Sequence, residues 1–176
     1  MKNLFLITLI SILFSISAVK AVAQTRSVYT SLSTKVCREL KSNADEGTEY
    51  QGDCPGIAGY KLRFLEGDLR QSIDVITPAK KKFQLGFWNI SGAFSHLGDK
   101  AEWRMKGRIP IALIVRFNSQ EDPENPKAVK SSLVVAKISA AESCITDVVV
   151  PMSNQNAIAR KLAEEAPTRA CMYPKQ

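Results

Sequence analysis

The fold is decided by the stretch from Ala101 to Asn118, which reads AEWRMKGRIPIALIVRFN. Apolar residues recur at every second position on both sides of Gly107, and this alternation is typical of strands that bury one face. The pattern therefore predicts a β-hairpin with strands over Ala101–Lys106 and Ile109–Asn118.

The second strand of this hairpin is apolar on both faces. Leu113 and Val115 lie on one face, and Ala112 and Ile114 lie on the other. A strand of this kind is typical of the centre of a sheet. Trp103 has the parity of Leu113, so we expect a three-residue turn, because an odd-length turn places both residues on one face.

Further strands are expected outside the hairpin. Period-two patterning predicts strands over Tyr60–Phe64 and Arg70–Ile76, and apolar runs predict two more over Val129–Ile138 and Cys144–Val150. The aromatic-rich segment Phe83–Phe94 is interrupted by glycines, so it is interpreted as either a bent strand or a packed loop.

Helices are expected at both ends of the domain. Near-helical spacing of apolar residues predicts a short helix within Ser27–Leu40, and the polar, acidic segment Lys41–Pro55 is interpreted as a loop. A second helix is expected to begin at Ser153 or Asn154 and to end before Pro167. The expected fold class is α+β: one domain with an antiparallel sheet of five or six strands and the C-terminal helix on one face.

The first 23 residues have the pattern of a secretory signal peptide. Lys2 precedes the apolar run Leu4–Val19, and the residues that end at Ala23 match an Ala-x-Ala cleavage site. The run is slightly shorter than a membrane-spanning helix usually needs, so we favour cleavage over an uncleaved anchor. We expect residues 24–176 to form a single exported domain that is periplasmic or secreted.

The four cysteines are expected to form two disulfides. They are even in number, and an oxidising compartment favours their pairing. Proximity along the chain favours Cys37–Cys54 and Cys144–Cys171 among the three possible connectivities. There is no C-x-x-C spacing, so a metal or redox site is not favoured, and we expect neither a metal nor a cofactor.

The charge of the chain is moderate. Its 176 residues include 24 Lys and Arg and 17 Asp and Glu, a formal charge of +7, and loss of Lys2 and Lys20 with the signal segment lowers it to +5. The basic run Lys80-Lys81-Lys82 has no interleaved aromatic residues, so a solvated turn is favoured over a polyanion site. We expect no nucleic-acid partner, and contact with a membrane only through the signal peptide before cleavage.

Three charged residues of the central hairpin are the main binding candidates. Glu102, Arg104 and Arg116 share the face opposite Trp103. Arg116 lies in an apolar strand and needs a partner, and Glu102 is the candidate that its parity allows. One hypothesis is a structural ion pair that fixes the register of the sheet. The other is a functional site for an anion or carboxylate, made by Arg104 and Arg116.

The only histidine, His96, is the first candidate for a general base. Residues 24–176 contain no G-x-S-x-G or Ser-x-x-Lys motif, so a surface histidine is favoured and no catalytic residue is assigned. His96 therefore joins Glu102, Arg104 and Arg116 only as a candidate binding residue.

Several motifs together resemble a family of small exported bacterial proteins. They are Cys37, the segment CPGIAGY at 54–60, Glu102-Trp103-Arg104, the segment ALIVR at 112–116, and the closing stretch from Asn156 to Cys171. The resemblance implies a bacterial periplasmic or secreted protein with two disulfides. It carries no activity and no functional residue over to this chain.

The function that we expect is that of a non-catalytic binding or accessory module of the bacterial envelope. Its partner would be an envelope protein or a small ligand. One alternative is a small cell-envelope hydrolase that uses His96 or a carboxylate near Glu102. Another is an inhibitor of a host or competitor enzyme, because a disulfide-stapled exported domain suits that role.

Overall fold

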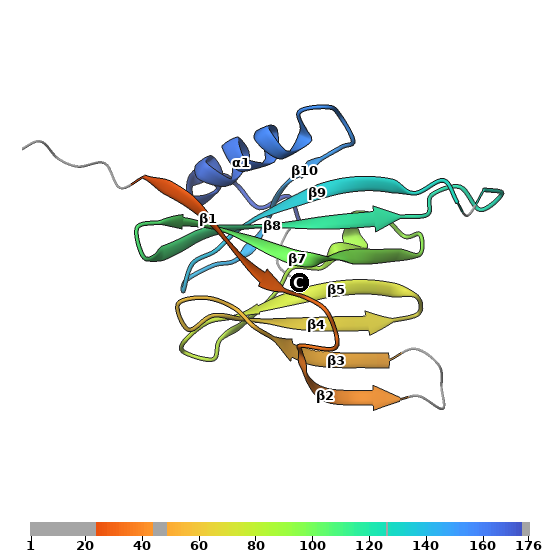
Figure 1. The fold of residues 1–176 in the computed structure, drawn as a ribbon, viewed down its shortest axis with the longest axis horizontal. Helices are drawn as coiled ribbons and strands as arrows, with labels where there is room; N and C mark the ends of the chain where they lie inside the picture. The colour runs from red at the N-terminus through yellow and green to blue at the C-terminus, as the bar shows by residue number, and fades with distance from the viewer. Residues whose placement is uncertain (1–23, 44–48, 126, 174–176) are drawn as a thin grey trace, which may run out of the picture.

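The computed structural model describes residues 24–43, 49–125 and 127–173, which form one sheet with a single α-helix against it (Figure 1). The predicted signal peptide, residues 1–23, lies outside the described residues. The elements are β1 Thr25–Ser31, β2 Arg38–Asn43, β3 Glu49–Cys54, β4 Lys61–Gly67, β5 Arg70–Ile76, β6 Lys82–Gln84, β7 Ser95–Lys106, β8 Ile109–Ser119, β9 Lys130–Lys137, β10 Cys144–Val149 and α1 Gln155–Glu165, with 3-10 turns at Phe87–Asn89 and Ala166–Thr168.

The expected α+β fold with five or six antiparallel strands is wrong. Within the described residues the sheet has ten strands, in the order β10-β9-β8-β7-β5-β4-β3-β2, with β1 paired to β7 and β6 paired to β5. The sheet is mixed, because β5 and β7 meet in parallel at the pair Arg70 and Ser95. The other strand pairs are antiparallel.

The expected N-terminal helix does not form, and its residues lie in β1, the following turn and β2. All seven residues of β1 pair with β7, from Thr25 opposite Lys106 to Ser31 opposite Lys100. Of the apolar residues that suggested a helix, Leu32 is buried but Val36 is 56% exposed. A long-range strand pairing therefore overrides the local spacing.

The segment Lys41–Pro55, expected to be a loop, contains the end of β2 and the whole of its partner β3, on either side of residues 44–48, which are not described. The Phe83–Phe94 segment divides into β6 and a 3-10 turn, which is closer to the packed loop than to a bent strand. The strand predictions around β4, β5, β9 and β10 are confirmed.

The central hairpin is confirmed as β7 and β8, but its turn has two residues rather than three. Lys106 pairs directly with Ile109. A shift in register next to Arg104 supplies the odd residue, so Trp103 still lies opposite Leu113. The expected sharing of a face is therefore correct, and a β-bulge produces it instead of the turn.

The sheet has a core on each face of β8. The larger core joins Trp103, Leu113 and Val115 to Leu62 and Ile73 from β4 and β5, so the two halves of the sheet enclose it together. The short contact between β5 and β7 leaves the sheet free to bend there. This arrangement lets strands from both halves of the sheet bury the same apolar cluster.

The second core lies beneath α1, which covers the other face of β8 and β9 (Figure 1). Ala159 and Ala163 of the helix pack against Ala112, Ile114 and Val135 of the strands. The small helix residues allow close approach to the sheet. The expected C-terminal helix is confirmed, with Asn154 as its N-cap residue and its end before Pro167.

Both predicted disulfides are confirmed. Cys37 is bonded to Cys54, which ties the turn before β2 to the end of β3. Cys144 is bonded to Cys171, which ties the start of β10 to the segment after α1. Among the described residues, no helix is long and apolar enough to cross a membrane.

Candidate binding site at the β7 bulge

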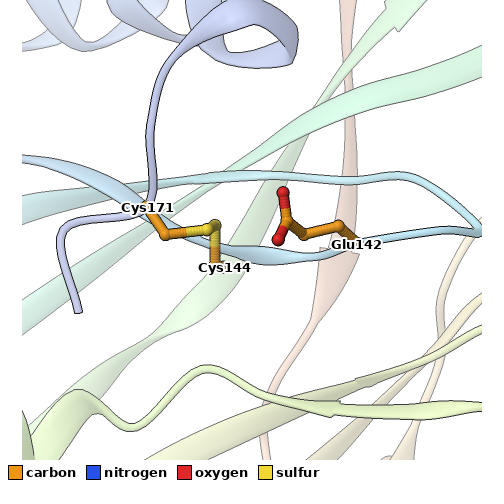
Figure 2. A group of neighbouring side chains, drawn as sticks. All are labelled: Glu142, Cys144 and Cys171. Carbon is orange, nitrogen blue, oxygen red and sulfur yellow. A yellow bond between two sulfur atoms is a disulfide. The ribbon is translucent and has the colours of Figure 1, made fainter. Parts of the chain in front are cut away.

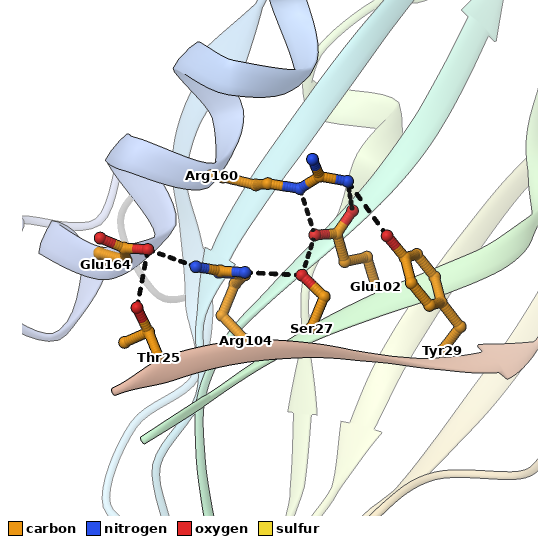
Figure 3. Close-up of polar contacts among 7 residues, drawn as sticks. All are labelled: Thr25, Ser27, Tyr29, Glu102, Arg104, Arg160 and Glu164. Atoms are coloured by element: carbon orange, nitrogen blue, oxygen red, sulfur yellow. Dashed lines mark hydrogen bonds and ion pairs between the residues drawn. The ribbon is translucent and has the colours of Figure 1, made fainter. Parts of the chain in front are cut away.

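A polar network fills the space between α1 and the paired strands β1 and β7. Figure 3 shows its members: Thr25, Ser27 and Tyr29 from β1, Glu102 and Arg104 from β7, and Arg160 and Glu164 from α1. Alternation along each strand explains the set, because Val28 and Trp103 turn to the larger core while their neighbours turn to the helix.

Glu102 is held by Arg160 and by β1. The Nε of Arg160 donates to Oε1 of Glu102 at 2.7 Å, and its Nη2 donates to Oε2 at 3.3 Å. The Ser27 hydroxyl also donates to this carboxylate. Burial raises the pKa of Glu102, but the hydrogen bonds from Arg160 and Ser27 outweigh it, so the net pKa is lowered.

Arg104 forms polar contacts with residues of the helix and of β1. Its Nη1 donates to the Ser27 hydroxyl at 2.6 Å, and its Nη2 pairs with Glu164, which also accepts from Thr25 at 2.9 Å. The hydrogen bond from Thr25, followed by that from Arg104, lowers the pKa of Glu164. Arg104 and Glu102 thus each have a partner of opposite charge on α1, and they attach the helix to the sheet.

A second irregularity in β7 opens the sheet next to this network. Leu97 pairs with Phe117 and Ala101 pairs with Val115, so the three residues 98–100 lie opposite Arg116 alone. Gly98 lies close to the stem of that arginine, since a Cβ there would be 3.0 Å from the Arg116 Cβ. Bulges of this kind redirect side chains and are frequent next to functional sites.

Arg116 is held by uncharged acceptors. Its Nη1 donates to the Ser131 hydroxyl at 2.9 Å and to Oε1 of Gln155 at 3.3 Å. Gln155 is itself fixed, because its amide donates to the carbonyl oxygens of Ser131 and Val149, both at 2.9 Å. The predicted pairing of Arg116 with Glu102 is wrong, because the carboxylate of Glu102 forms its ion pair with Arg160.

These residues line a cleft between the β7 bulge, β8 and the start of α1, with a volume of about 310 Å³. We call it the bulge cleft; it is lined by Tyr29, Gly98, Asp99, Lys100, Glu102, Ile114, Arg116, Leu133 and Asn156. Two of the four residues predicted from the sequence, Glu102 and Arg116, meet there. Arg104 and His96 are not part of its lining.

His96 lies on β7 opposite Asn118, with its side chain exposed. No hydrogen bond or ion pair of its ring is found within the described part of the chain. Its neighbour Ser95 is buried. The structure therefore does not bring His96 together with a hydroxyl nucleophile or with Glu102.

One close grouping of potential metal ligands occurs among the described residues: Glu142, Cys144 and Cys171 (Figure 2). Both sulfur atoms are bonded to each other in the disulfide, so they offer no thiolate to a metal. Glu142 forms an ion pair with Lys137 at 2.6 Å. In its oxidised form this group has a structural role.

Sequence reasoning missed the helix residues Arg160 and Glu164 and the bulge at 98–100. The helix pair could have been found, because residues four apart share one face of a helix and this face borders the one whose alanines pack on the sheet. The bulge has no local signal except Gly98, since it is defined by strand register.

No protein-family model, curated protein or solved structure matches this chain. The functional argument therefore rests on the geometry of the cleft.

Proposed function

We propose that the protein is a non-catalytic binding module of the bacterial envelope, and that the bulge cleft takes a small ligand with a carboxylate. The observation that carries this proposal is that the guanidinium of Arg116 has no partner of opposite charge among the described residues. Its hydrogen bonds in the described structure go to Ser131 and Gln155, which are both neutral, while it faces a cleft. A guanidinium in this position has charge and donors left for an anion.

The donors of Arg116 suit a carboxylate. The contacts with Ser131 and Gln155 both use Nη1, and no hydrogen bond of Nε or Nη2 is found within the described part of the chain. Two parallel N–H groups of a guanidinium match the two oxygens of a carboxylate. Lys100 and Asn156 at the rim supply a second cation and an amide.

The other charges of the cleft favour a singly charged ligand. Asp99 and Glu102 also line it, so a highly charged anion would be repelled. Glu102 is already balanced by Arg160 and serves as a fixed wall. Leu133 and Ile114 offer an apolar surface for the organic part of the ligand.

The absence of catalysis and the envelope location are parts of the same proposal. His96 lies outside the cleft lining, and the two disulfides fit an oxidising compartment. Export itself rests on the sequence of residues 1–23. The hydrolase and inhibitor hypotheses remain predictions, and no contact among the described residues favours either.

Calorimetric titration of the purified chain with acetate, succinate and alanyl-alanine tests the proposal. We expect acetate or alanyl-alanine to bind more tightly than the doubly charged succinate, and Arg116→Gln to weaken that binding about tenfold or more, the loss of one charged hydrogen-bonding contact. Arg108→Gln removes the same charge from the exposed β7–β8 turn and serves as the matched control.

Thermal melts of both variants accompany the titrations. Because Arg116 has neutral partners, we expect Arg116→Gln to keep a melting temperature within about 3 °C of the native value. A folded Arg116→Gln variant that binds the carboxylate as well as the native chain would contradict the proposal. So would the lack of binding by all three carboxylates.

A further inference from the structure

A second cavity lies on the outer face of the β2–β6 half of the sheet, away from α1. Its volume is about 440 Å³, and we call it the basic pocket. Five cations and one carboxylate are among its lining residues: Arg38, Lys61, Arg63, Lys80, Lys82 and Asp53. An excess of cations over carboxylates in the lining of a cleft concentrates positive electrostatic potential there.

The strand register explains one part of this lining. Arg38, Asp53, Arg63 and Asp74 form a row across β2, β3, β4 and β5, in which each residue is paired with the next. Cross-strand partners share a face of the sheet, so the row alternates in charge and balances itself. The two arginines are therefore part of a neutral structural row.

Asp53 orients both arginines of the row. Its Oδ1 accepts from the Nε of Arg63 at 2.8 Å, and its Oδ2 accepts from Nη2 of Arg38 at 3.1 Å. Burial raises the pKa of Asp53, but the contacts with Arg63 and Arg38 outweigh burial and lower the net pKa. The carboxylate is therefore held ionised. Arg63 is thus fixed at the wall of the pocket, and Arg38, whose side chain is 71% exposed, is oriented by the same carboxylate.

The excess charge comes from three lysines beside this row. Lys61 of β4 and Lys82 of β6 both pair with Ile76 of β5, one from each side. Their side chains therefore lie on the same face of the sheet, on either side of Ile76. Lys82 lies 3.6 Å from Asp74. Within the described residues neither Lys61 nor Lys80 has an ion pair within 4.0 Å, although both line the pocket.

All three lysines of the basic run at 80–82 are exposed, as a solvated turn predicts, but their side chains point to different places. The amide of Lys80 donates to the Thr77 carbonyl oxygen at 2.8 Å, and the amide of Lys81 donates to the Thr77 hydroxyl at 3.0 Å. Lys81 turns to the ring of Phe83, 4.5 Å from its centroid. The tight turn thus divides the run, and Lys80 and Lys82 reach the pocket.

We propose that the basic pocket binds a phosphate group, either as a free phosphate or as the head group of an anionic lipid. Lys61, Lys80 and Lys82 supply the charge that the ligand neutralises, and Arg38 and Arg63, which Asp53 orients, supply directed donors. Planar guanidinium groups and lysine ammonium groups are the usual phosphate partners in proteins. This site is separate from the bulge cleft, and it does not depend on the function proposed there.

The test compares two charge-neutralising double variants of the full chain. Lys61→Gln with Lys80→Asn removes the two lysines that have no ion pair, and asparagine suits the left-handed backbone of Lys80, whose φ is 63°. Lys106→Gln with Arg108→Gln removes the same charge from the exposed β7–β8 turn. A thermal melt of each variant shows whether it is folded.

Two probes distinguish the source of the phosphate. Inorganic phosphate is titrated calorimetrically at low salt, and phosphatidylcholine vesicles with or without phosphatidic acid are used in a sedimentation assay. We expect one probe to bind, and the pocket variant to weaken it about tenfold, as two modest charge contacts would give. Binding of inorganic phosphate assigns a free ligand, and binding of only the phosphatidic acid vesicles assigns a head group.

Two results would overturn the proposal. One is the lack of binding by both probes, whether or not the chain binds a single-stranded oligonucleotide. The other is an equal loss in the Lys106 and Arg108 control, since that would show attraction by net charge alone. Arg116→Gln should leave phosphate binding unchanged, which separates this test from that of the bulge cleft.

Discussion

Arg160 of α1 contacts Glu102 of β7 through two nitrogens, with Nε 2.7 Å from Oε1 and Nη2 3.3 Å from Oε2 (Figure 3). The same Nη2 donates to the Tyr29 hydroxyl at 3.1 Å. Glu102 and Tyr29 both line the bulge cleft. The ion pair therefore fixes the helix on the sheet and also fixes one wall of the candidate site.

Replacement of Arg160 should destabilise the fold. Arg160→Met leaves the nearly buried carboxylate of Glu102 without its main partner. Loss of one partner of a fully buried pair costs about 3–5 kcal/mol, and the partial exposure of Arg160 reduces the expected loss to about 1–2 kcal/mol. Urea denaturation at pH 7 measures it.

Lys161→Met is the matched control, because this exposed neighbour removes a charge from the same helix without a partner in the network. The double variant Glu102→Gln with Arg160→Met should regain part of the lost stability, since no charge is then left unpaired. Equal free energies of unfolding for Arg160→Met and Lys161→Met would show that the pair contributes nothing.

The stability that Glu102 contributes should depend on pH. The folded state lowers the pKa of Glu102 below its ordinary value of 4.5. Its contribution is therefore complete above about pH 4.5 and is lost as the pH falls through the folded pKa. The difference in unfolding free energy between the native chain and Glu102→Gln should be large at pH 7 and should shrink toward pH 3.

Urea denaturation at several pH values measures this difference, with Glu124→Gln in an exposed loop as the control. A subtraction of two chains is needed, because the folded state also lowers the pKa of Asp53 and Glu164. A Glu102→Gln difference that stays constant from pH 7 to pH 3 would show that this carboxylate is not stabilised by the fold.

The central hairpin shows how much the sequence could predict. Strict alternation placed Glu102 and Arg104 on the face opposite Trp103, and the structure confirms it, since both contact α1 while Trp103 enters the larger core. Such a pattern is reliable because a shift by one residue would bury the charged set. The two disulfides could also be predicted from the sequence, since the paired cysteines are close along the chain.

Two of the errors have the same physical cause, which is pairing between distant segments. Nothing local in Thr25–Ser31 shows that it pairs with residues 100–106, and a spacing of three or four residues suggested a helix there. The partner of Arg116 was wrong for the same reason. Parity allowed Glu102, but Arg160, which is 58 positions away in the chain, competes for that carboxylate.

Asp74 should be a destabilising residue at neutral pH. It is 1% exposed, and neither carboxylate oxygen has a hydrogen-bond partner among the described residues. Burial raises its pKa, and the charges of Lys82 and Arg63 only partly oppose this. A raised carboxyl pKa means that stability falls as the pH rises through the window above 3.8, the ordinary value of this group.

Asp74→Asn should therefore raise the melting temperature at pH 7 by a few degrees, at about 2–4 °C for each kcal/mol in a domain of this size. The gain should disappear near pH 3, where the native carboxyl group is protonated in both states. Differential scanning calorimetry at the two pH values measures it. A lower melting temperature for Asp74→Asn at pH 7 would mean that the charged row needs this carboxylate.

The two disulfides should contribute comparably to stability. They join residues 17 and 27 positions apart. Chain entropy then gives about 3 kcal/mol for the shorter loop and about 3.5 kcal/mol for the longer one. Paired serine replacements, measured by urea denaturation, should show these losses. Mass spectrometry of a non-reduced digest checks the connectivity, and a Cys54–Cys144 peptide would contradict the structure.

Gly98→Ala should damage the bulge cleft while leaving the fold largely intact. The new Cβ would lie 3.0 Å from the Cβ and 3.8 Å from the Cγ of Arg116, so the arginine stem must move. Overpacking of this kind costs about 1–2 kcal/mol, and the displaced guanidinium should bind a carboxylate about tenfold more weakly. Gly92→Ala is the control, since a Cβ there has no heavy atom within 4 Å. Calorimetric titration with the carboxylate that the native chain binds, together with a thermal melt, separates the two effects. Native affinity in a folded Gly98→Ala variant would show that the position of Arg116 opposite the bulge does not matter for binding.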